Sequence, residues 1–110
     1  MAAVAGVLAV VAAIAVPAAD GRGTKTVKVG DDFFSPTTLG VKKGTKVAFK
    51  WVGDNKHNII KKSGPGKDFS SPVTSRDGVQ FKHKFKKAGT YKLICTIHDG
   101  MKMKIKVSGG

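Results

Sequence analysis

The chain has 110 residues, which is enough for one small domain and too few for a second folded unit. Its 20 lysine and arginine residues outnumber 7 acidic residues and give a net charge of +13, but 41% of the residues are hydrophobic, which excludes a disordered polybasic tail. The single cysteine excludes an internal disulfide, a zinc ribbon and a thioredoxin-type cysteine pair.

Residues 2–19 form an apolar run without any charged or polar side chain. The run is rich in small residues, and its end, Val16-Pro17-Ala18-Ala19-Asp20, offers a cleavage motif of the Val-x-Ala or Pro-x-Ala type. We therefore expect residues 1–19 to be an apolar leader helix, used as a signal peptide or membrane anchor, and residues 20–110 to be the folded domain. No lysine or arginine precedes the run, and 18 apolar residues could just span a bilayer, so cleavage and anchoring both stay open. Either way, we expect an exported domain in the periplasm or another extracytoplasmic space.

Beyond the leader, hydrophobic residues recur with a period of two, which is typical of strands. This alternation predicts strands over residues 26–29, 47–51, 81–85 and 101–107. Turn-forming residues such as Gly53-Asp54-Asn55 and Asp77-Gly78 separate them, whereas residues 61–76 show no clear period and are expected to form a long connection with at most a short helical turn. Short strands separated by turns predict an all-β fold, an antiparallel sandwich or barrel.

The segment from Cys95 to Met101 carries three candidate metal ligands, Cys95, His98 and Met101, each three residues from the next. On a loop, this spacing lets the three side chains converge on one point. A fourth candidate, His57, lies far upstream in another loop and is followed by Asn58. One thiolate, two imidazoles and one thioether form neither a zinc set nor a calcium set, but they suit a mononuclear copper site with Met as the weak axial ligand. The sequence therefore predicts one copper ion per chain.

Such a donor set indicates electron transfer. Soft sulfur ligands favour Cu(I) and imidazole suits Cu(II), so a fixed compromise geometry changes little when one electron is exchanged. An apolar collar is expected to keep water from the ion and to help set its potential. The residues expected in this collar are Phe34, Phe49, Ile97 and Met103.

Each candidate also has an ordinary structural interpretation. A lone Cys95 is more often a small core residue, and Met101 could be the first core residue of an alternating strand. The presence of all four candidate ligands favours metal binding over these alternatives. Met103 and Trp51 are better explained as core residues, and His83, on an apolar face, as a hydrogen-bonded structural histidine.

Several motifs resemble those of the small blue copper proteins, the cupredoxins of the plastocyanin, pseudoazurin and amicyanin group. In chain order they are Phe34-Ser35-Pro36, Leu39, Val41 to Val47, His57-Asn58, Phe85, Ala88-Gly89-Thr90-Tyr91 and Cys95-Thr96-Ile97-His98. The spacing between His98 and Met101 is similar to that of amicyanin, although amicyanin-like loops usually carry proline where this chain has Asp99-Gly100. This departure leaves the potential and the choice of partner open.

The resemblance implies a Greek-key β-sandwich in which Asn58 braces the ligand loop. Its side chain would contact Thr96, and its backbone would donate a hydrogen bond to the sulfur of Cys95. His98 would be the ligand nearest to solvent, within an apolar patch through which the electron passes.

Two functions agree with these features. The favoured one is a one-electron carrier between membrane-associated donors and acceptors, and the alternative is a copper storage or delivery protein. Catalysis of the kind found in multicopper oxidases or nitrite reductases is disfavoured because it needs further histidine ligands, and the chain has only His57, His83 and His98. We therefore do not expect an enzyme.

The lysines allow more than one interpretation. Six of them lie at outward positions of two predicted strands, namely Lys82, Lys84, Lys86, Lys102, Lys104 and Lys106. They could form ordinary solvated faces, or they could attract acidic redox partners in transient electrostatic docking. Nucleic-acid binding is disfavoured because few aromatic residues remain outside the predicted core and because the leader exports the chain. We expect a monomer, with a membrane tether possible through residues 1–19.

Overall fold

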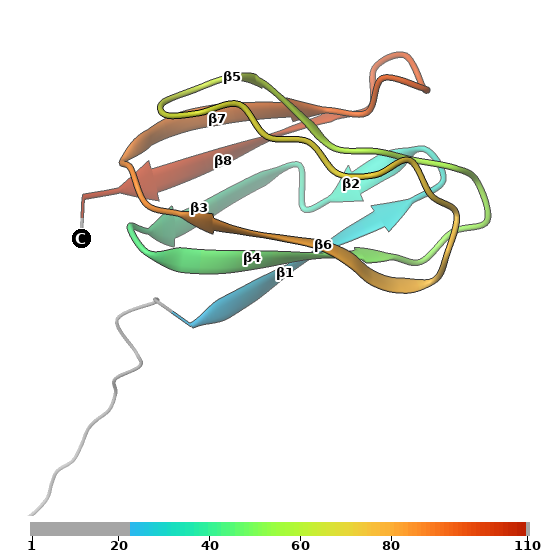
Figure 1. Ribbon diagram of the computed structural model, residues 1–110, viewed down its shortest axis with the longest axis horizontal. Helices are drawn as coiled ribbons and strands as arrows, with labels where there is room; N and C mark the ends of the chain where they lie inside the picture. The colour runs from blue at the N-terminus through green and yellow to red at the C-terminus, as the bar shows by residue number, and fades with distance from the viewer. Residues whose placement is uncertain (1–22, 110) are drawn as a thin grey trace, which may run out of the picture.

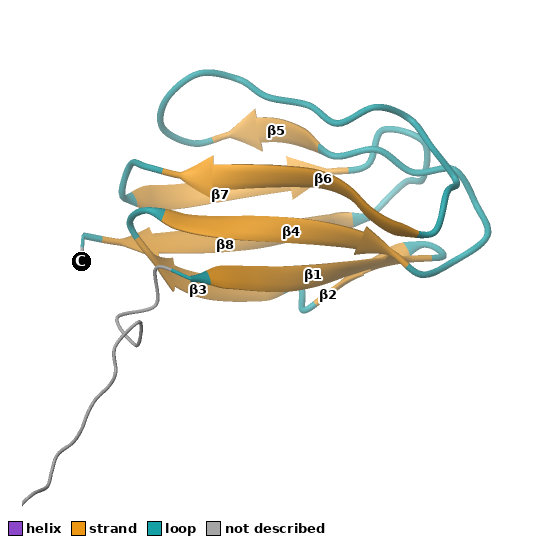
Figure 2. Ribbon diagram, turned by 60° about the horizontal axis from the view of Figure 1, so that its bottom comes forward, coloured by secondary structure: helices purple, strands orange, loops and turns teal. Residues whose placement is uncertain are grey.

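The computed structural model describes residues 23–109, which form a sandwich of two four-stranded sheets (Figure 1). The first sheet has the order β2-β1-β4-β6 and consists of β1 (Thr24–Gly30), β2 (Phe33–Ser35), β4 (Thr45–Trp51) and β6 (Gly78–Phe85). The second has the order β3-β8-β7-β5 and consists of β3 (Thr38–Lys42), β5 (Ile60–Ser63), β7 (Gly89–Ile94) and β8 (Lys102–Ser108). Figure 2 shows only strands and loops for this part of the chain, so residues 23–109 hold no helix able to cross a membrane.

Both sheets are mixed. The all-β sandwich is confirmed, but the expectation of a purely antiparallel arrangement is wrong, because β1 runs parallel to β4 and β3 runs parallel to β8. The chain changes sheet between most consecutive strands, so neighbours in a sheet are often distant in sequence and need not be antiparallel. The leader helix predicted for residues 1–19 lies outside the described residues.

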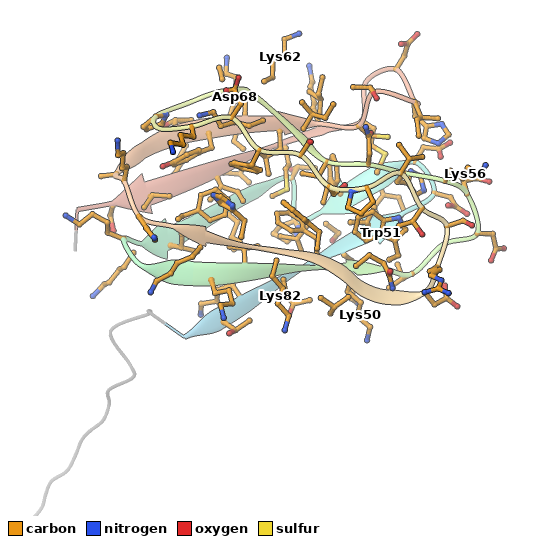
Figure 3. The ribbon with its side chains drawn as sticks, viewed as in Figure 1. Lys50, Trp51, Lys56, Lys62, Asp68 and Lys82 are labelled. Carbon is orange, nitrogen blue, oxygen red and sulfur yellow. The ribbon has the colours of Figure 1, made fainter. Side chains whose placement is uncertain are left out.

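The core lies between the sheets and is built by alternating side chains. In β8, Met103, Ile105 and Val107 are buried while the intervening lysines are exposed. Figure 3 shows the same division for the first sheet, where Trp51 points between the sheets and Lys50 points outward. Full burial of one large apolar side chain contributes about 1.5–3 kcal/mol, so the period-two pattern both predicts and stabilises these strands.

The segment expected as a long connection is the least accurately predicted part of the fold. It includes most of β5, a short edge strand in which Ile60 pairs with Ile94. Beyond β5 it is a loop, and no helical turn occurs between residues 61 and 76. Phe69 folds back from this loop and stacks on the ring of His83, with 3.8 Å between ring centroids. This stacking agrees with the structural role expected for that histidine, whereas its expected hydrogen bond stays a prediction.

The two ends of the sandwich differ in their loops. One end, on the right in Figure 1, carries residues 31–32, 52–59, 71–77 and 95–101, and we call it the site end. The opposite end carries the β3–β4 turn, the β6–β7 turn and the start of β1. All four predicted ligands therefore lie at or next to one end.

Candidate metal centre

Cys95, His98 and Met101 lie on the tight loop that joins β7 to β8. The backbone N–H of Cys95 donates to the carbonyl oxygen of Met101 at 3.0 Å, and the N–H of Met101 donates to that of His98 at 3.3 Å. Gly100 has a φ of 78°, a left-handed conformation that glycine adopts without strain. These features close the base of the loop, so the side chains of Cys95, His98 and Met101 all extend from one tight turn.

The three side chains differ in their access to solvent. Cys95 is a free thiol, and both Cys95 and Met101 belong to the buried hydrophobic core. The side chain of His98 is 24% exposed. All three line one shallow surface pocket, so the two sulfur atoms come from the inside and the imidazole comes from the surface.

His57 reaches the site from the connection after β4. Its side chain is fully buried, and its ring centroid lies 4.8 Å from that of His98. Its backbone N–H and C=O pair with Thr74 at 3.0 and 3.1 Å, which holds the residue from the other side. The fold thus brings two imidazoles together from distant parts of the sequence.

Asn58 joins the segment of His57 to the ligand loop. Its side-chain Nδ2 donates to Oγ1 of Thr96 at 3.0 Å, and its Oδ1 accepts the backbone N–H of Thr96 at 2.9 Å. Because Asn58 follows His57 and Thr96 follows Cys95, these two bonds hold the two ligand segments against each other. The bracing role of Asn58 is confirmed, whereas its backbone bond to the Cys95 sulfur stays a prediction.

Both imidazoles form their hydrogen bonds through Nε2. That atom of His57 lies 2.9 Å from Oδ1 of Asp31, and that of His98 lies 3.0 Å from the carbonyl oxygen of Lys56. A carboxylate and a carbonyl only accept, so in the neutral ring Nε2 carries the proton and Nδ1 carries a free lone pair. The Nδ1 atom of His57 is buried and has no hydrogen-bond partner. An orphaned nitrogen of this kind fits a metal ligand.

Asp31 is a site residue that the sequence analysis did not predict. It accepts backbone N–H bonds from Asp54 at 2.8 Å and Asn55 at 2.9 Å in addition to its contact with His57. The bond from the Asp54 N–H is the main cause that lowers the pKa of Asp31 to about 2, followed by the contact with His57. A Cβ on Gly53 would collide with this carboxylate, so the glycine leaves room for it. Asp31 therefore stays ionised and orients the imidazole.

Asp32 was also missed. One ligating atom from each of Asp32, His57 and His98 lies within 4.8 Å of the other two. Oδ1 of Asp32 is 3.4 Å from Nε2 of His98, and its side chain is 49% exposed. Within the described part of the chain, Cys95 is not a member of this group, and the backbone and Asn58 contacts described above are what tie it to the site. No sequence pattern signals a carboxylate that approaches from a different turn.

Three of the four residues predicted for the apolar collar are buried, and their arrangement around the ion stays a prediction. Phe34, Phe49 and Met103 are buried, with at most 3% of each exposed. Ile97 is 44% exposed, so the expectation that it shields the site from water is wrong.

Comparison with known proteins agrees with copper binding. The sequence pattern of the copper binding proteins of the plastocyanin/azurin family matches residues 22–108. Amicyanin-alpha of Methylorubrum extorquens is 36% identical over 87 residues, which cover 77% of this chain and 72% of that protein. A plastocyanin of Dryopteris crassirhizoma is 34% identical over 94 residues, covering 71% of this chain and 92% of the plastocyanin.

A solved structure extends the comparison to the fold. The copper-containing nitrite reductase NirK from Thermus scotoductus SA-01 matches 78% of this chain with a TM-score of 0.67 at 26% identity. This chain spans only 22% of the reductase chain. The pattern match, by contrast, extends over nearly all of residues 23–109, and the cluster of Asp32, His57 and His98 could hold a copper ion. The chain therefore belongs to the plastocyanin/azurin family of copper binding proteins, with copper as its cofactor and amicyanin among its relatives.

Proposed function

We propose that this protein is a blue copper electron carrier whose ligands are His57, Cys95, His98 and Met101. The observation that carries the proposal is the buried Nδ1 of His57, which lacks a partner in a ring that lies 4.8 Å from the ring of His98. Bound copper supplies a couple that cycles between Cu(I) and Cu(II). The electron-carrier relatives amicyanin-alpha and plastocyanin support the same role.

The residues of the chain have distinct tasks in this function. His57 and His98 offer Nδ1 atoms, Cys95 offers a thiolate and Met101 offers a weaker thioether. The Asn58–Thr96 bonds and the closed base of the ligand loop support a rigid donor geometry. A rigid site changes little when an electron arrives or leaves, which favours fast transfer.

Electron exchange would take place at the site end. His98 is the ligand with solvent access, and the exposed Ile97 lies next to it in the loop. We propose transient docking of redox partners there. The net charge of +13 draws acidic partners toward the molecule as a whole, although the loops of the site end carry five of its aspartates. The apolar run over residues 2–19 supports an extracytoplasmic location for this exchange.

We propose a carrier and not an enzyme. A second copper centre would need further imidazoles, and His83, the remaining histidine, stacks on Phe69 and packs edge-on against Phe85, away from the ligand loop. The likeness to nitrite reductase covers only a fraction of that enzyme and does not supply the missing histidines.

A spectrum of the copper-loaded protein tests the proposal. Addition of Cu(II) to the apoprotein should give intense visible absorption from sulfur-to-copper charge transfer and a type 1 paramagnetic resonance signal. Cys95→Ser should abolish the band, and Met101→Gln should keep some colour while shifting the potential. Ile105→Val, a change at a buried core position of β8, is the control and should leave the spectrum unchanged. A colourless copper complex would contradict the blue copper assignment.

A second candidate, copper storage or delivery, is favoured by Asp32. Its exposed carboxylate beside both imidazoles offers a site from which an ion could be passed to an acceptor. A carrier should keep copper through repeated oxidation and reduction, whereas a delivery protein should lose it to a chelating acceptor. If delivery is the function, Asp32→Asn should slow that loss.

A further inference from the structure

Charge is divided unevenly between the two ends of the sandwich. Six acidic residues occur among residues 23–109, and five of them lie in the loops of the site end. These five are Asp31, Asp32, Asp54, Asp77 and Asp99. The sixth, Asp68, lies after β5.

Lysines dominate the opposite end. Six exposed lysines lie there, and we call the surface that carries them the lysine-rich end. They are Lys25, Lys42, Lys43, Lys86, Lys87 and Lys106. They come from the start of β1, the β3–β4 turn, the β6–β7 turn and the last part of β8. Neither turn contains an acidic residue.

Contacts between these elements place the six lysines on one surface. Lys25, Lys42 and Lys106 line the same shallow pocket. The β3–β4 turn is tied to β8 by the N–H of Lys43, which donates to Ser108, and to the end of β6 by the N–H of Gly44, which donates to Phe85. The six lysines therefore belong to elements that meet at one end of the sandwich, on the left in Figure 1.

The chain enters the sandwich at this same end. β1 starts at Thr24, beside the start of β4, where Thr24 pairs with Lys46. Ala19, the last residue of the apolar run, is five residues earlier in the sequence, so chain geometry limits its distance from Thr24 to about 17 Å. A surface that holds the Ala19 end of the apolar run would therefore lie within this distance of the start of β1.

We propose that the lysine-rich end binds an anionic phospholipid surface and directs the site end away from it. Lysine ammonium groups on flexible stems act as adaptable point charges and suit a diffuse array of phosphate headgroups. The five aspartates of the site end are repelled by the same surface, so the charge division fixes the orientation. His98 and Ile97 then remain open to partners in solution.

The structure favours lipid over the other anionic partners. Binding of single-stranded nucleic acid relies on exposed aromatic rings for stacking, but Phe85 and Tyr91, the aromatic residues near this end, are at most 3% exposed. An acidic protein would match the charge equally well. It would not, however, account for the position of these lysines beside the start of β1, only five residues after an apolar run that could enter a membrane.

Vesicle binding of the full chain tests the proposal. Leu8, Val11 and Ile14 are first changed to Gln, so that the apolar run does not insert by itself. Binding is then measured by cosedimentation with vesicles of phosphatidylglycerol and phosphatidylcholine, and with vesicles of phosphatidylcholine alone, at about 50 mM and about 500 mM salt. We expect binding only to the anionic vesicles and only at low salt.

Two triple variants in this background separate position from net charge. Lys43→Gln, Lys86→Gln and Lys87→Gln remove three charges from the lysine-rich end, and the affinity for anionic vesicles should fall about tenfold or more. The matched control carries Lys28→Gln, Lys50→Gln and Lys82→Gln, which are changes of exposed lysines elsewhere on the first sheet. It should lower the affinity for anionic vesicles by less than about threefold. Thermal unfolding verifies that both variants fold.

Three results would overturn the proposal. Equal losses in the two triple variants would mean that only net charge matters. Equal binding to neutral and anionic vesicles would exclude recognition of headgroups. Binding of poly-glutamate that depends on the three lysines, without binding of vesicles, would identify an acidic protein as the partner instead.

Discussion

Oδ1 of Asp31 lies 2.9 Å from Nε2 of His57, and this contact joins the β1–β2 turn to the metal centre. The backbone N–H of Asp54 donates to Oδ2 of this carboxylate and the backbone N–H of Asn55 donates to Oδ1, and together they hold it in place. A carboxylate that accepts the outer N–H of a ligating histidine fixes the ring and raises its basicity. Asp31 therefore acts as a positioning residue for His57 and is not itself a proposed ligand.

Asp31→Asn should weaken copper binding. The amide is neutral and orients the imidazole less firmly, and loss of such outer contacts lowers metal affinity by about 10–100-fold. The affinity is measured by competition with a chelator of known strength. Asp54→Asn, an exposed change in a neighbouring turn, is the control and should leave the affinity within about twofold.

Gly53→Ala provides an independent check of the same contact. The added methyl group would occupy the space of the Asp31 carboxylate and should displace it. Its copper affinity should fall in the same direction as that of Asp31→Asn. If both variants bound copper like the unmodified protein, the contact would have no part in holding the ion.

The strands that could be predicted from sequence are those with one buried face. In β4 and β8, apolar and polar residues alternate in the sequence as buried and exposed residues do in the structure, and both strands occur where this pattern predicts them. β5 has two lysines in succession and no alternation because it is a short edge strand, so it was missed. The parallel pairing of β1 with β4 depends on contacts between distant segments, which local periodicity does not encode.

The candidate site divides in the same way. The spacing of Cys95, His98 and Met101 is local, and the predicted loop is confirmed by the backbone bonds that close it. Asp31 and Asp32 precede His57 by 26 and 25 residues and lie in the β1–β2 turn. The sequence of that turn indicates only that the chain reverses direction. Only the sandwich brings that turn to the imidazoles.

Asn58→Ala should destabilise the apoprotein. It removes two hydrogen bonds and leaves the N–H and hydroxyl of Thr96 without these partners, which costs about 1–3 kcal/mol. Thr96→Val removes only the hydroxyl bond and should cost less, about 0.5–1.5 kcal/mol. Urea unfolding of both single variants and the double variant measures the coupling. Strict additivity in the double variant would show that the two residues do not act as a pair.

Lys61→Met should destabilise the loop after β5. The Lys61 side chain is buried, and its ammonium donates to the carbonyl oxygens of Pro65, Gly66 and Lys67 at 2.8, 2.8 and 3.1 Å. Methionine keeps the packing but leaves these carbonyls unsatisfied, at a cost of about 1–3 kcal/mol. Denaturant unfolding measures the loss, and hydrogen exchange should show faster opening of the loop.

Lys62→Met is the matched control for this change. Lys62 is exposed, and Figure 3 shows it pointing away from the sandwich, so its replacement should alter the stability by no more than about 0.5 kcal/mol. If Lys61→Met were equally mild, the three carbonyl bonds would contribute nothing to stability.

The stability of the apoprotein should depend on pH through His83. Burial against Phe69, followed by the positive charges of Lys61 and Lys86, lowers the pKa of His83 below its usual 6.5. Between that lowered pKa and 6.5, the unfolded chain binds a proton that the folded chain does not, so the free energy of unfolding falls as the pH falls.

His83→Phe removes this contribution of His83 to the pH dependence. The stability of the unmodified protein should therefore decline relative to the variant as the pH is lowered from about 8 to about 5, as measured by urea midpoints. Lys86→Gln should reduce the decline by raising the pKa of His83, and parallel curves for the unmodified protein and His83→Phe would show that His83 has no such role.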